Sequence, residues 1–192
     1  MIDLSICMVS YNTRQLLADC LHSIRASGTR RSYELIISDN GSTDGTLEML
    51  TAEFPEVQVI CNDRNLGYTL PMNQALRRAS GRYLVQLNPD TLVQPGLFDT
   101  LVDYLEANPQ VGILSPRVLN RDGSLQLQCR RSAARPGDAL SYMLHLDRLF
   151  PNSRRFGGYL MTYMDEHTTH EAEAVSGSCM LIRREVLEGI GY

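Results

Sequence analysis

The chain lacks the features of membrane-spanning, secreted and disulfide-stabilised proteins. No apolar stretch approaches the ~18 residues of a membrane-spanning helix, and the N-terminus has neither the basic region nor the long apolar region of a signal peptide. Cys-x-x-Cys pairs are also absent, and the cysteines are odd in number and widely spaced: Cys7, Cys20, Cys61, Cys129 and Cys179. A disulfide framework and a zinc site are therefore disfavoured, and a reducing, cytoplasmic location is expected. Because Cys7, Cys61 and Cys179 lie in apolar runs, we expect them to be small core side chains.

An excess of positive charge is lacking as well. The 192 residues carry 18 basic and 22 acidic side chains, a net charge of −4, which gives no support for a nucleic-acid partner. Arginines nevertheless cluster in three places: Arg130, Arg131 and Arg135; Arg154 and Arg155; and Arg183 and Arg184. Any single cluster is typical of a solvated face. Together they could cover an anionic ligand or lipid headgroups.

Two common nucleotide-binding motifs are missing. Neither the Gly-x-Gly-x-x-Gly of a dinucleotide site nor the Gly-Lys-Ser/Thr of a P-loop occurs, which argues against both classes. His167 and His170 lie near several acidic residues and could suggest a metal site. Their segment has no helical periodicity and no complete ligand set, so we interpret it as a solvated loop.

The sequence does contain a regular alternation of strand-like and helix-like segments. Its composition, 43% apolar and 21% charged, is that of a globular domain. Apolar runs predict strands at 4–9, 33–38, 57–61 and 83–87. Helical spacing predicts three helices between them: one that starts after Thr13, one that starts around Thr43, and one that follows the third strand and continues through Ala79. This alternation requires parallel β-α-β units. The predicted fold class is α/β, with a mostly parallel sheet flanked by helices on both faces.

Polar residues follow each of these four strands. They lie at Ser10–Asn12, Asp39–Ser42, Asn62–Gly67 and Asn88–Asp90. In open α/β sheets, ligands bind beyond the carboxyl ends of the strands. The four polar segments therefore predict a shared ligand site.

The second half of the chain is less regular. We expect a helix at 95–106, a strand at 111–115, a hairpin at 118–125 with Asp-Gly at its turn, a helix at 138–150, a strand at 174–182 and a short helix at 183–188. Between Cys129 and His170, the helix at 138–150 is the only element that we predict.

Two of the polar segments point to specific chemistry. In Asn88-Pro89-Asp90, two oxygen-bearing side chains flank a rigid proline, and such hard ligands suit Mg²⁺ or Mn²⁺. The alternative is a plain Pro-Asp turn. A carboxylate at Asp39 can accept a hydrogen bond from the N–H of a pyrimidine ring, whereas the alternative makes it a turn residue. For the following Ser42, Thr43 and Asp44 we expect helix capping.

At these residues the sequence resembles the family 2 glycosyltransferases, which have the GT-A fold. The resemblance rests on four segments in order: 9–12, 38–46, 65–68 with Asn73, and 87–91. The later part is similar to the rhamnosyltransferase-like branch, through 123–126, Arg130-Arg131 and 176–184. It implies one GT-A domain over 1–192, with a nucleotide-sugar-binding half at 1–117 and the start of an acceptor-binding half at 118–192.

The resemblance also implies roles for individual residues. Donor binding would involve Ser10, Tyr11, Asn12, Asp39, Asn65, Gly67, Asn88 and Asp90. In these roles Tyr11 packs on the base, Asp39 bonds its ring, and Asn65 and Gly67 lie along the ribose and diphosphate. Asp90 would ligate Mg²⁺ or Mn²⁺, with Asn88 as a second, weaker candidate because its amide is neutral. Gly177 and Ser178 would line the acceptor side.

The implied reaction is an inverting sugar transfer from a nucleoside diphosphate sugar, rhamnose or a similar hexose, to a lipid-linked or polysaccharide acceptor. The acceptor would lie at the inner face of the membrane, where peripheral contact would give the arginine clusters a role. In the family, the general base lies shortly after the segment that ends here at Tyr192. We therefore expect the chain to be a fragment of a longer protein and assign no catalytic residue within it; the sequence sets no oligomeric state.

Two other classes remain open. One is a sugar-nucleotide-binding module without activity. The other is a nucleotidyltransferase, which is disfavoured because no Gly-rich, basic phosphate loop follows the first strand.

Overall fold

The structure, a computed structural model, describes residues 2–133 and 135–191. It divides into two compact units. The first contains the residues up to Pro116 together with those from Gly177 onward, and the second is Arg117–Ser176. Residues 177–191, which we assigned to an acceptor-binding half, thus belong to the unit that holds the main sheet. No helix among the described residues is both long and apolar enough to cross a membrane.

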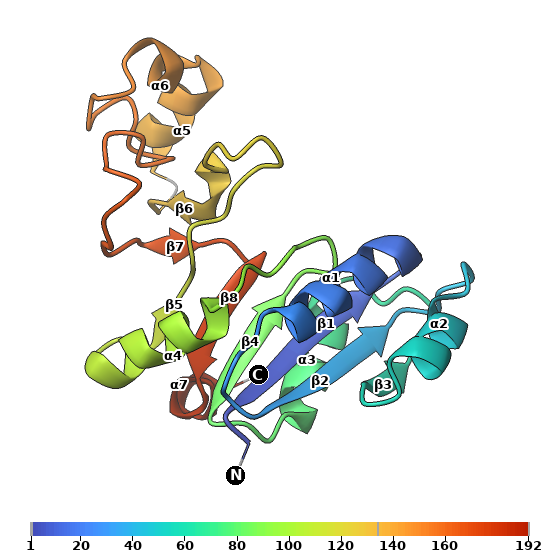
Figure 1. Cartoon of the computed structure of the whole chain (residues 1–192). Coiled ribbons are helices and arrows are strands. Elements are labelled where there is room, and N and C mark those ends of the chain that lie inside the picture. Colours follow the sequence, from blue (N-terminus) through green and yellow to red (C-terminus); the bar gives the residue numbers. More distant parts are fainter. Residues whose placement is uncertain (1, 134, 192) are drawn as a thin grey trace. The chain divides into compact units, whose positions relative to one another are not determined.

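The first unit is built on a six-stranded sheet (Figure 1). Its strands are β1 (Leu4–Ser10), β2 (Tyr33–Asp39), β3 (Gln58–Cys61), β4 (Tyr83–Leu87), β5 (Ile113–Leu114) and β8 (Cys179–Arg183), in the order β3-β2-β1-β4-β8-β5. The first four are parallel to one another, and β8 is antiparallel to both of its neighbours. The predicted α/β class with a mostly parallel sheet is confirmed.

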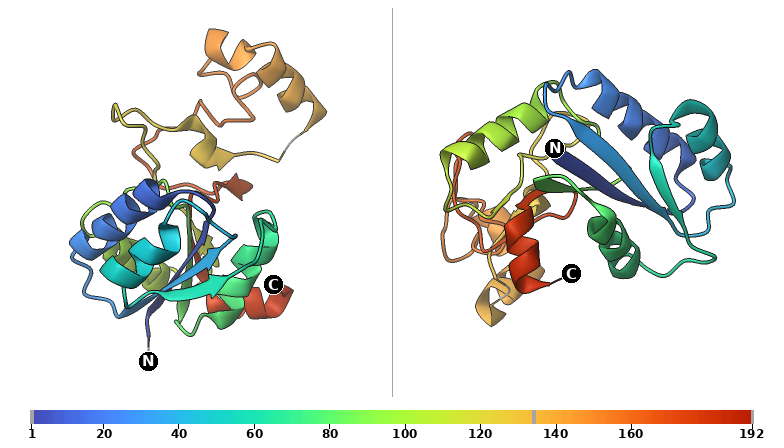
Figure 2. Two further views of the ribbon diagram at one scale, coloured as in Figure 1. Left: turned by 90° about the vertical axis from the view of Figure 1, so that its right-hand side faces the viewer. Right: turned by 90° about the horizontal axis from the view of Figure 1, so that it is seen from below.

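Helices cover both faces of this sheet, as Figure 2 shows. They are α1 (Arg14–Ala26), α2 (Thr46–Glu53), α3 (Thr69–Arg78), α4 (Leu97–Ala107) and α7 (Arg184–Ile190). Successive side chains of a strand point to opposite faces. Leu4, Ile6 and Met8 of β1 accordingly pack in the cluster that contains α1, α2 and α4, whereas Cys7 and Val9 pack in the cluster with α3 and α7.

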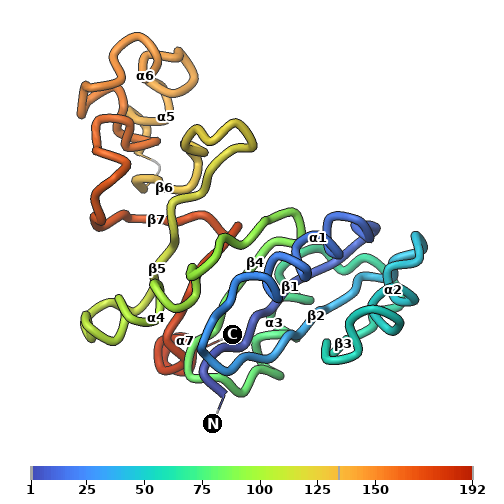
Figure 3. The backbone as a smooth tube through the Cα atoms, in the orientation of Figure 1, coloured from blue at the N-terminus to red at the C-terminus, as the bar shows by residue number. Residues whose placement is uncertain are grey.

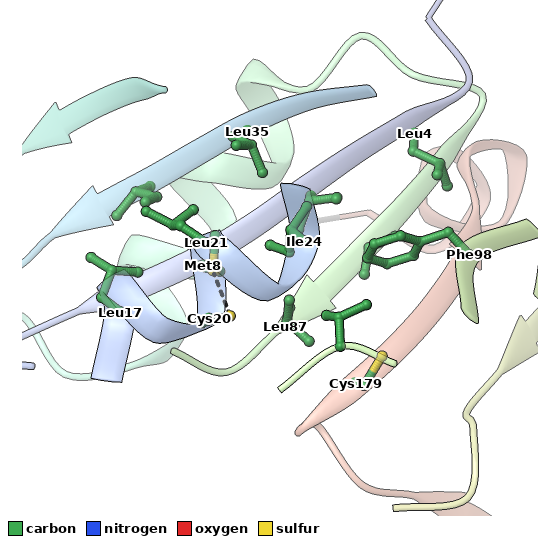
Figure 4. Packing of buried hydrophobic residues seen from close by; sticks show 14 of the residues in the cluster. Leu4, Met8, Leu17, Cys20, Leu21, Ile24, Leu35, Leu87, Phe98 and Cys179 are labelled. Carbon is green, nitrogen blue, oxygen red and sulfur yellow. Dashed lines mark hydrogen bonds between the residues drawn. The ribbon is translucent and has the colours of Figure 1, made fainter. Parts of the chain in front are cut away.

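The larger cluster shows why α1 forms where it does. Leu17, Leu21 and Ile24 recur at helical spacing and lie over the sheet, where they are fully or almost fully buried (Figure 4). Burial of a leucine or isoleucine side chain stabilises a fold by about 1.5–3 kcal/mol. The helix ends before Gly28, which has a φ of +66°, as a glycine just after a helix commonly does.

Three predicted capping residues, Thr13, Ser42 and Thr43, do not cap a helix. Thr13 precedes α1, but its hydroxyl lies 3.0 Å from the hydroxyl of Ser10 instead of bonding the helix. Helix α2 begins at Thr46 rather than around Thr43. Of the three residues expected to cap it, Asp44 does so, because its carboxylate accepts the N–H and the hydroxyl of Thr46. Ser42 instead bonds Asp39.

The predicted strand at 174–182 is wrong as a single element. Residues Ala174–Val175 form β7, which pairs with β6 (Arg130–Arg131) in a separate two-stranded sheet, and Cys179–Arg183 form β8. The polar, small residues 176–178 interrupt the run. The strand expected at 111–115 is shorter than predicted, and it lies at the sheet edge beside β8. Figure 3 follows the chain out of the first unit after β5 and back into it at β8.

The second unit also contains η1 (Leu127–Cys129), α5 (Pro136–Met143) and α6 (Leu146–Leu149). The predicted hairpin at 118–125 is confirmed by the pairing of Leu119 with Leu125 and by Gly123, whose φ is +84°. The single helix predicted at 138–150 is wrong, because the chain turns at His145, where φ is +53°, and splits it into α5 and α6.

The last arginine pair has a structural role. The Arg183 guanidinium donates to the carbonyls of Leu105 and Val111, where α4 ends. The Arg184 guanidinium donates to the carbonyls of Ala79 and Gly81, where α3 ends, at 3.0 and 2.7 Å. Cations at helix C-termini satisfy the last carbonyls. This pair is therefore neither a solvated face nor a cover for lipid headgroups.

The cysteines should differ sharply in reactivity. Cys61 is exposed, contrary to its predicted place in the core, whereas the other four are buried. Burial raises the pKa of Cys7, Cys20 and Cys179 to about 12, and the thiolate is the reactive form. At pH 8 a thiol reagent should label Cys61 alone in the folded chain and all five cysteines after denaturation. Fast labelling of a Cys61→Ser variant in the folded state would contradict this assignment.

Candidate functional site

The carboxyl ends of β1, β2 and β4 meet at one edge of the sheet. Strand β1 lies between β2 and β4, so the strand order reverses there. Ser10, the last residue of β1, pairs with Asp39, the last residue of β2, and Asn88 directly follows β4. Ligands of doubly wound sheets bind in the crevice at this kind of reversal. Three of the four polar segments identified in the sequence thus come together where a ligand is expected.

The loops after β1 and β2 are bonded to each other. The backbone N–H of Asn12 donates to the Ser42 hydroxyl at 2.9 Å, and the Asn12 side chain accepts the N–H of Thr43 at 2.9 Å. Asn12 has a φ of +52°, the left-handed conformation that asparagine tolerates better than most residues. Its observed role is to hold the two loops together. Tyr11, the residue before it, keeps a side chain that is 45% exposed.

Asp39 is fully buried, and its carboxylate is already engaged. One oxygen accepts the backbone N–H of Ser42 at 2.8 Å, and the other accepts the Ser42 hydroxyl at 2.6 Å. Each carboxylate oxygen has two lone pairs, so two acceptor positions remain. Asp39 therefore does stabilise the turn, which was the alternative interpretation of this residue. A hydrogen bond to a nucleobase would be an additional contact of the same carboxylate.

Asp44 joins the same two loops and should contribute to stability. It accepts the N–H of Arg14, the first residue of α1, at 2.9 Å, as well as two bonds from Thr46. Burial alone would raise its pKa, but these hydrogen bonds outweigh burial and lower it.

We expect Asp44→Ala to lower the free energy of unfolding by about 1–2 kcal/mol, the range for a lost helix cap. Because the folded-state pKa is depressed, the contribution is complete above the unfolded pKa of about 3.9 and is lost progressively as the pH falls from there through the folded-state pKa. Urea unfolding of both chains at pH 7 and pH 3 measures the difference, and a gap that did not narrow at pH 3 would contradict this origin.

The 62–67 loop is held by a network of amides that the sequence did not reveal. Asn40, 2% exposed, donates to the carbonyl of Gly67 at 2.8 Å. Asn62 exchanges hydrogen bonds with Gln74 of α3 at 3.1 Å in both directions. Asn65 accepts the N–H of Gly67 at 2.8 Å. The predicted donor residues Asn65 and Gly67 are thus positioned by Asn40, whose buried amide has the geometry of a positioning residue.

The segment after β4 is fixed by the segment before β8. The N–H of Asn88 donates to the carbonyl of Ser178 at 2.9 Å, and the hydroxyl of Tyr68 donates to the Asn88 side chain at 3.3 Å. Gly177 lies against β4, because a Cβ there would come within 2.6 Å of the Gln86 amide. Gly177 and Ser178 therefore adjoin the Asn-Pro-Asp motif.

Asp90 fits a divalent metal. Its side chain is exposed, and none of the described residues forms a hydrogen bond or an ion pair with its carboxylate. Within residues 2–133 and 135–191, no cluster of three or more His, Cys, Asp or Glu side chains could hold an ion by itself. Mg²⁺ is commonly bound through one or two carboxylates together with substrate phosphates. The single free carboxylate of Asp90 therefore suits a metal ion whose other ligands come from a bound diphosphate.

The histidine segment belongs to the second unit. His167 is exposed and lies 3.1 Å from the Arg117 guanidinium, and both belong to the second unit. The predicted solvated loop fits this placement.

The sequence model of the family described as Glycosyl transferase family 2 matches residues 5–191. Because the match covers almost the whole chain, the chain belongs to this family, as the resemblance of its motifs predicted. Its sheet and helices match those of GT-A structures.

Among individual relatives, an N-acetylglucosaminyl-diphospho-decaprenol L-rhamnosyltransferase of Mycobacterium tuberculosis is 26% identical over 199 residues, which cover 98% of the chain and 64% of the relative. Two solved structures share the fold across 98% of the chain. TarS of S. aureus in complex with UDP-GlcNAc has a TM-score of 0.64 at 15% identity, with 47% of it covered. The mannosyltransferase PcManGT of Pyrobaculum calidifontis, with GDP-Man and Mn²⁺, has a TM-score of 0.62 at 20% identity, with 46% covered. The chain spans less than two thirds of each of these relatives.

Proposed function

We propose that the chain binds a nucleoside diphosphate sugar and serves an inverting glycosyl transfer to an acceptor hydroxyl. The observation that carries this proposal is the convergence of Ser10, Asp39 and the Asn88–Asp90 turn at the reversal of the strand order. Membership of glycosyltransferase family 2 supports it. The same edge offers a buried acceptor for a base and an exposed carboxylate for a metal-bound diphosphate.

In this proposal the nucleoside lies over the ends of β1 and β2. The exposed ring of Tyr11 packs on the base, and a free acceptor position of Asp39 receives the ring N–H. Asn65 and Gly67, held by Asn40, line the ribose and diphosphate. Ser10 is fully buried, so we assign its part in donor binding to its backbone and to the support it gives Thr13.

Asp90 would hold Mg²⁺ or Mn²⁺, with Asn88 beside it. When bound, the ion would stabilise the charge that develops on the leaving diphosphate. The Mn²⁺ of the mannosyltransferase PcManGT supports a divalent metal in this fold. The Asn88 side chain accepts the Tyr68 hydroxyl, and the Asn88 backbone N–H donates to the Ser178 carbonyl; these two bonds position the turn that carries Asp90. We assign Gly177 and Ser178 to the acceptor side.

The similarity to the mycobacterial rhamnosyltransferase favours a deoxyhexose such as rhamnose as the transferred sugar. That relative acts on N-acetylglucosaminyl-diphospho-decaprenol, which also favours a lipid-linked acceptor for this chain. Sugar transfer would then occur at the cytoplasmic face of a membrane, in the synthesis of a surface glycan. Gln126, Arg130 and Arg131 of the second unit belong to the part of the chain that carries this similarity.

Calorimetry against a panel of nucleoside diphosphates, with and without Mn²⁺, tests the donor part. We expect metal-dependent binding with a preference for one base. Product analysis in the presence of an acceptor extract tests the reaction. Released nucleoside diphosphate supports glycosyl transfer, and released pyrophosphate would show nucleotidyl transfer. Donor binding without any product would favour a non-catalytic module.

A further inference from the structure

The second unit exposes an unusual concentration of large apolar side chains. Leu140, Met143 and Leu144 recur at helical spacing on α5 and its end, and their exposed fractions are 58%, 75% and 58%. Leu149 and Phe150, at the end of α6, are 69% and 52% exposed. Helices α5 and α6 contact each other, so these residues belong to one part of the unit (Figure 1). We call these five residues the apolar patch.

Positive charge accompanies this patch. The ring of Phe150 lies 5.4 Å from that of Phe156, and the Arg155 guanidinium lies 5.9 Å from the same Phe156 ring. Arg148 and Arg154 are exposed as well. None of the described residues forms an ion pair with Arg148, Arg154 or Arg155, in contrast to Arg30 and Arg31 of the first unit, which pair with Asp103.

Negative charge is almost absent from the segment. Asp147 is the only acidic residue between Ala139 and Met164, and its side chain is buried. The exposed charge of 139–164 is therefore that of three arginines, on a chain whose net charge is −4. Of these, Arg154 also lines a hollow with Asp138, Glu171 and Glu173 without forming an ion pair with them. Large apolar side chains next to unpaired cations are the composition of segments that lie in the interface of an anionic membrane.

We propose that the apolar patch, with Arg148, Arg154 and Arg155, docks the chain on the surface of an anionic lipid bilayer. The leucine, methionine and phenylalanine side chains enter the boundary between headgroups and acyl chains, and the three guanidinium groups bind lipid phosphates. The inference rests on exposure and charge within the second unit. It agrees with a lipid-linked acceptor but does not depend on donor binding or sugar transfer.

Sedimentation with vesicles of phosphatidylcholine, with and without 30 mol% phosphatidylglycerol in about 0.1 M salt, tests the proposal. The 192-residue chain should bind the anionic vesicles and not the neutral ones, and 0.5 M salt should weaken the binding. Removal of one arginine should weaken it about fivefold, so Arg154→Gln/Arg155→Gln should weaken it about 25-fold. Met143→Ser/Leu149→Ser should weaken it by about tenfold or more.

Two control variants carry the same kinds of substitution at exposed residues outside the apolar patch. Arg64→Gln/Arg121→Gln removes two exposed arginines elsewhere, and Leu92→Ser changes a leucine that is 62% exposed in the first unit. Both should bind like the unmodified chain. Every altered residue is exposed, and Arg154 and Arg155 contact only the rings of Tyr163 and Phe156 among the aromatic side chains of the described residues, so all variants should stay folded with small changes in thermal unfolding.

Three results would overturn the proposal. The first is no binding to anionic vesicles, and the second is an equal loss of binding in the patch variants and the control variants. The third is a chain that does not bind lipid but self-associates, with the self-association abolished by Met143→Ser/Leu149→Ser. The last would make the patch a contact between copies of the chain. Because the vesicles contain neither donor nor acceptor, failure here leaves the proposed sugar transfer untouched, and inactivity in sugar transfer leaves this result untouched.

Discussion

Replacement of Asp90 by alanine should abolish the Mn²⁺- or Mg²⁺-dependent part of nucleoside diphosphate binding. Asp90 has an exposed carboxylate with no hydrogen-bond or ion-pair partner among the described residues, so its loss removes a ligand and little else. The loss of a charged ligand contact costs about 3 kcal/mol, which corresponds to an affinity that is ~100-fold weaker. Calorimetry with and without the metal measures both parts of the binding.

Asp63→Ala is the matched control, because Asp63 is an exposed acidic residue in the neighbouring 62–67 loop. It should leave the metal-dependent binding in place. Asn88→Ala should have a smaller effect than Asp90→Ala, since an amide is a weaker ligand and the Asn88 backbone keeps its bond to Ser178. Metal-dependent binding that survives in a folded Asp90→Ala chain would remove this residue from the metal site.

Replacement of Asp39 by alanine should weaken nucleoside diphosphate binding by about 1–3 kcal/mol, the value of a hydrogen bond to a charged group. Uridine and thymidine diphosphates should lose affinity alike, because both rings present the same N3–H. Asp39 also accepts two hydrogen bonds from Ser42. Asp39→Ala therefore removes the bonds of this turn as well as the contact with the base.

Ser42→Ala separates the two roles. It removes the hydroxyl bond to Asp39 but leaves the carboxylate in place, and it also removes the acceptor of the Asn12 N–H. If Asp39 receives the base, Ser42→Ala should bind nucleotide far better than Asp39→Ala. Equal losses in the two variants, with equal losses in stability, would show that Asp39 serves the turn alone.

The first half of the fold could be predicted from the sequence because each strand there is a short apolar run closed by polar residues. Tyr83–Leu87 matches its predicted bounds, and the other parallel strands differ by a residue at one end. Strand order could not be predicted in the same way. Nothing in the apolar pattern of 179–183 indicates that β8 inserts between β4 and β5, because pairing depends on contacts between residues far apart in the chain.

The errors in the second half have local causes. The break between β7 and β8 occurs at Ser176-Gly177-Ser178, a polar signal inside a run that we predicted as continuous. The turn at His145 contains no glycine or proline, so no helix-breaking residue indicates it.

For the site, the polar strand ends were predictable from their positions after apolar runs. The roles of Asn40, Asn62 and Gln74 were not. Their amides meet only when β2, the 62–67 loop and α3 come together.

The chain leaves the six-stranded sheet after β5 and re-enters it at β8, and this affects how such a protein can change over evolution. Strands β5 and β8 are neighbours, and the hydroxyl of Ser115 donates to the carbonyl of Cys179 at 2.8 Å. The sixty or so residues between them therefore leave and rejoin the sheet at almost the same point. The entropy of closing such an excursion grows only with the logarithm of its length, so a twofold change in length costs about 0.6 kcal/mol. Insertions, deletions or a wholesale exchange of this segment can therefore accumulate while the six-stranded sheet and its polar strand ends stay intact.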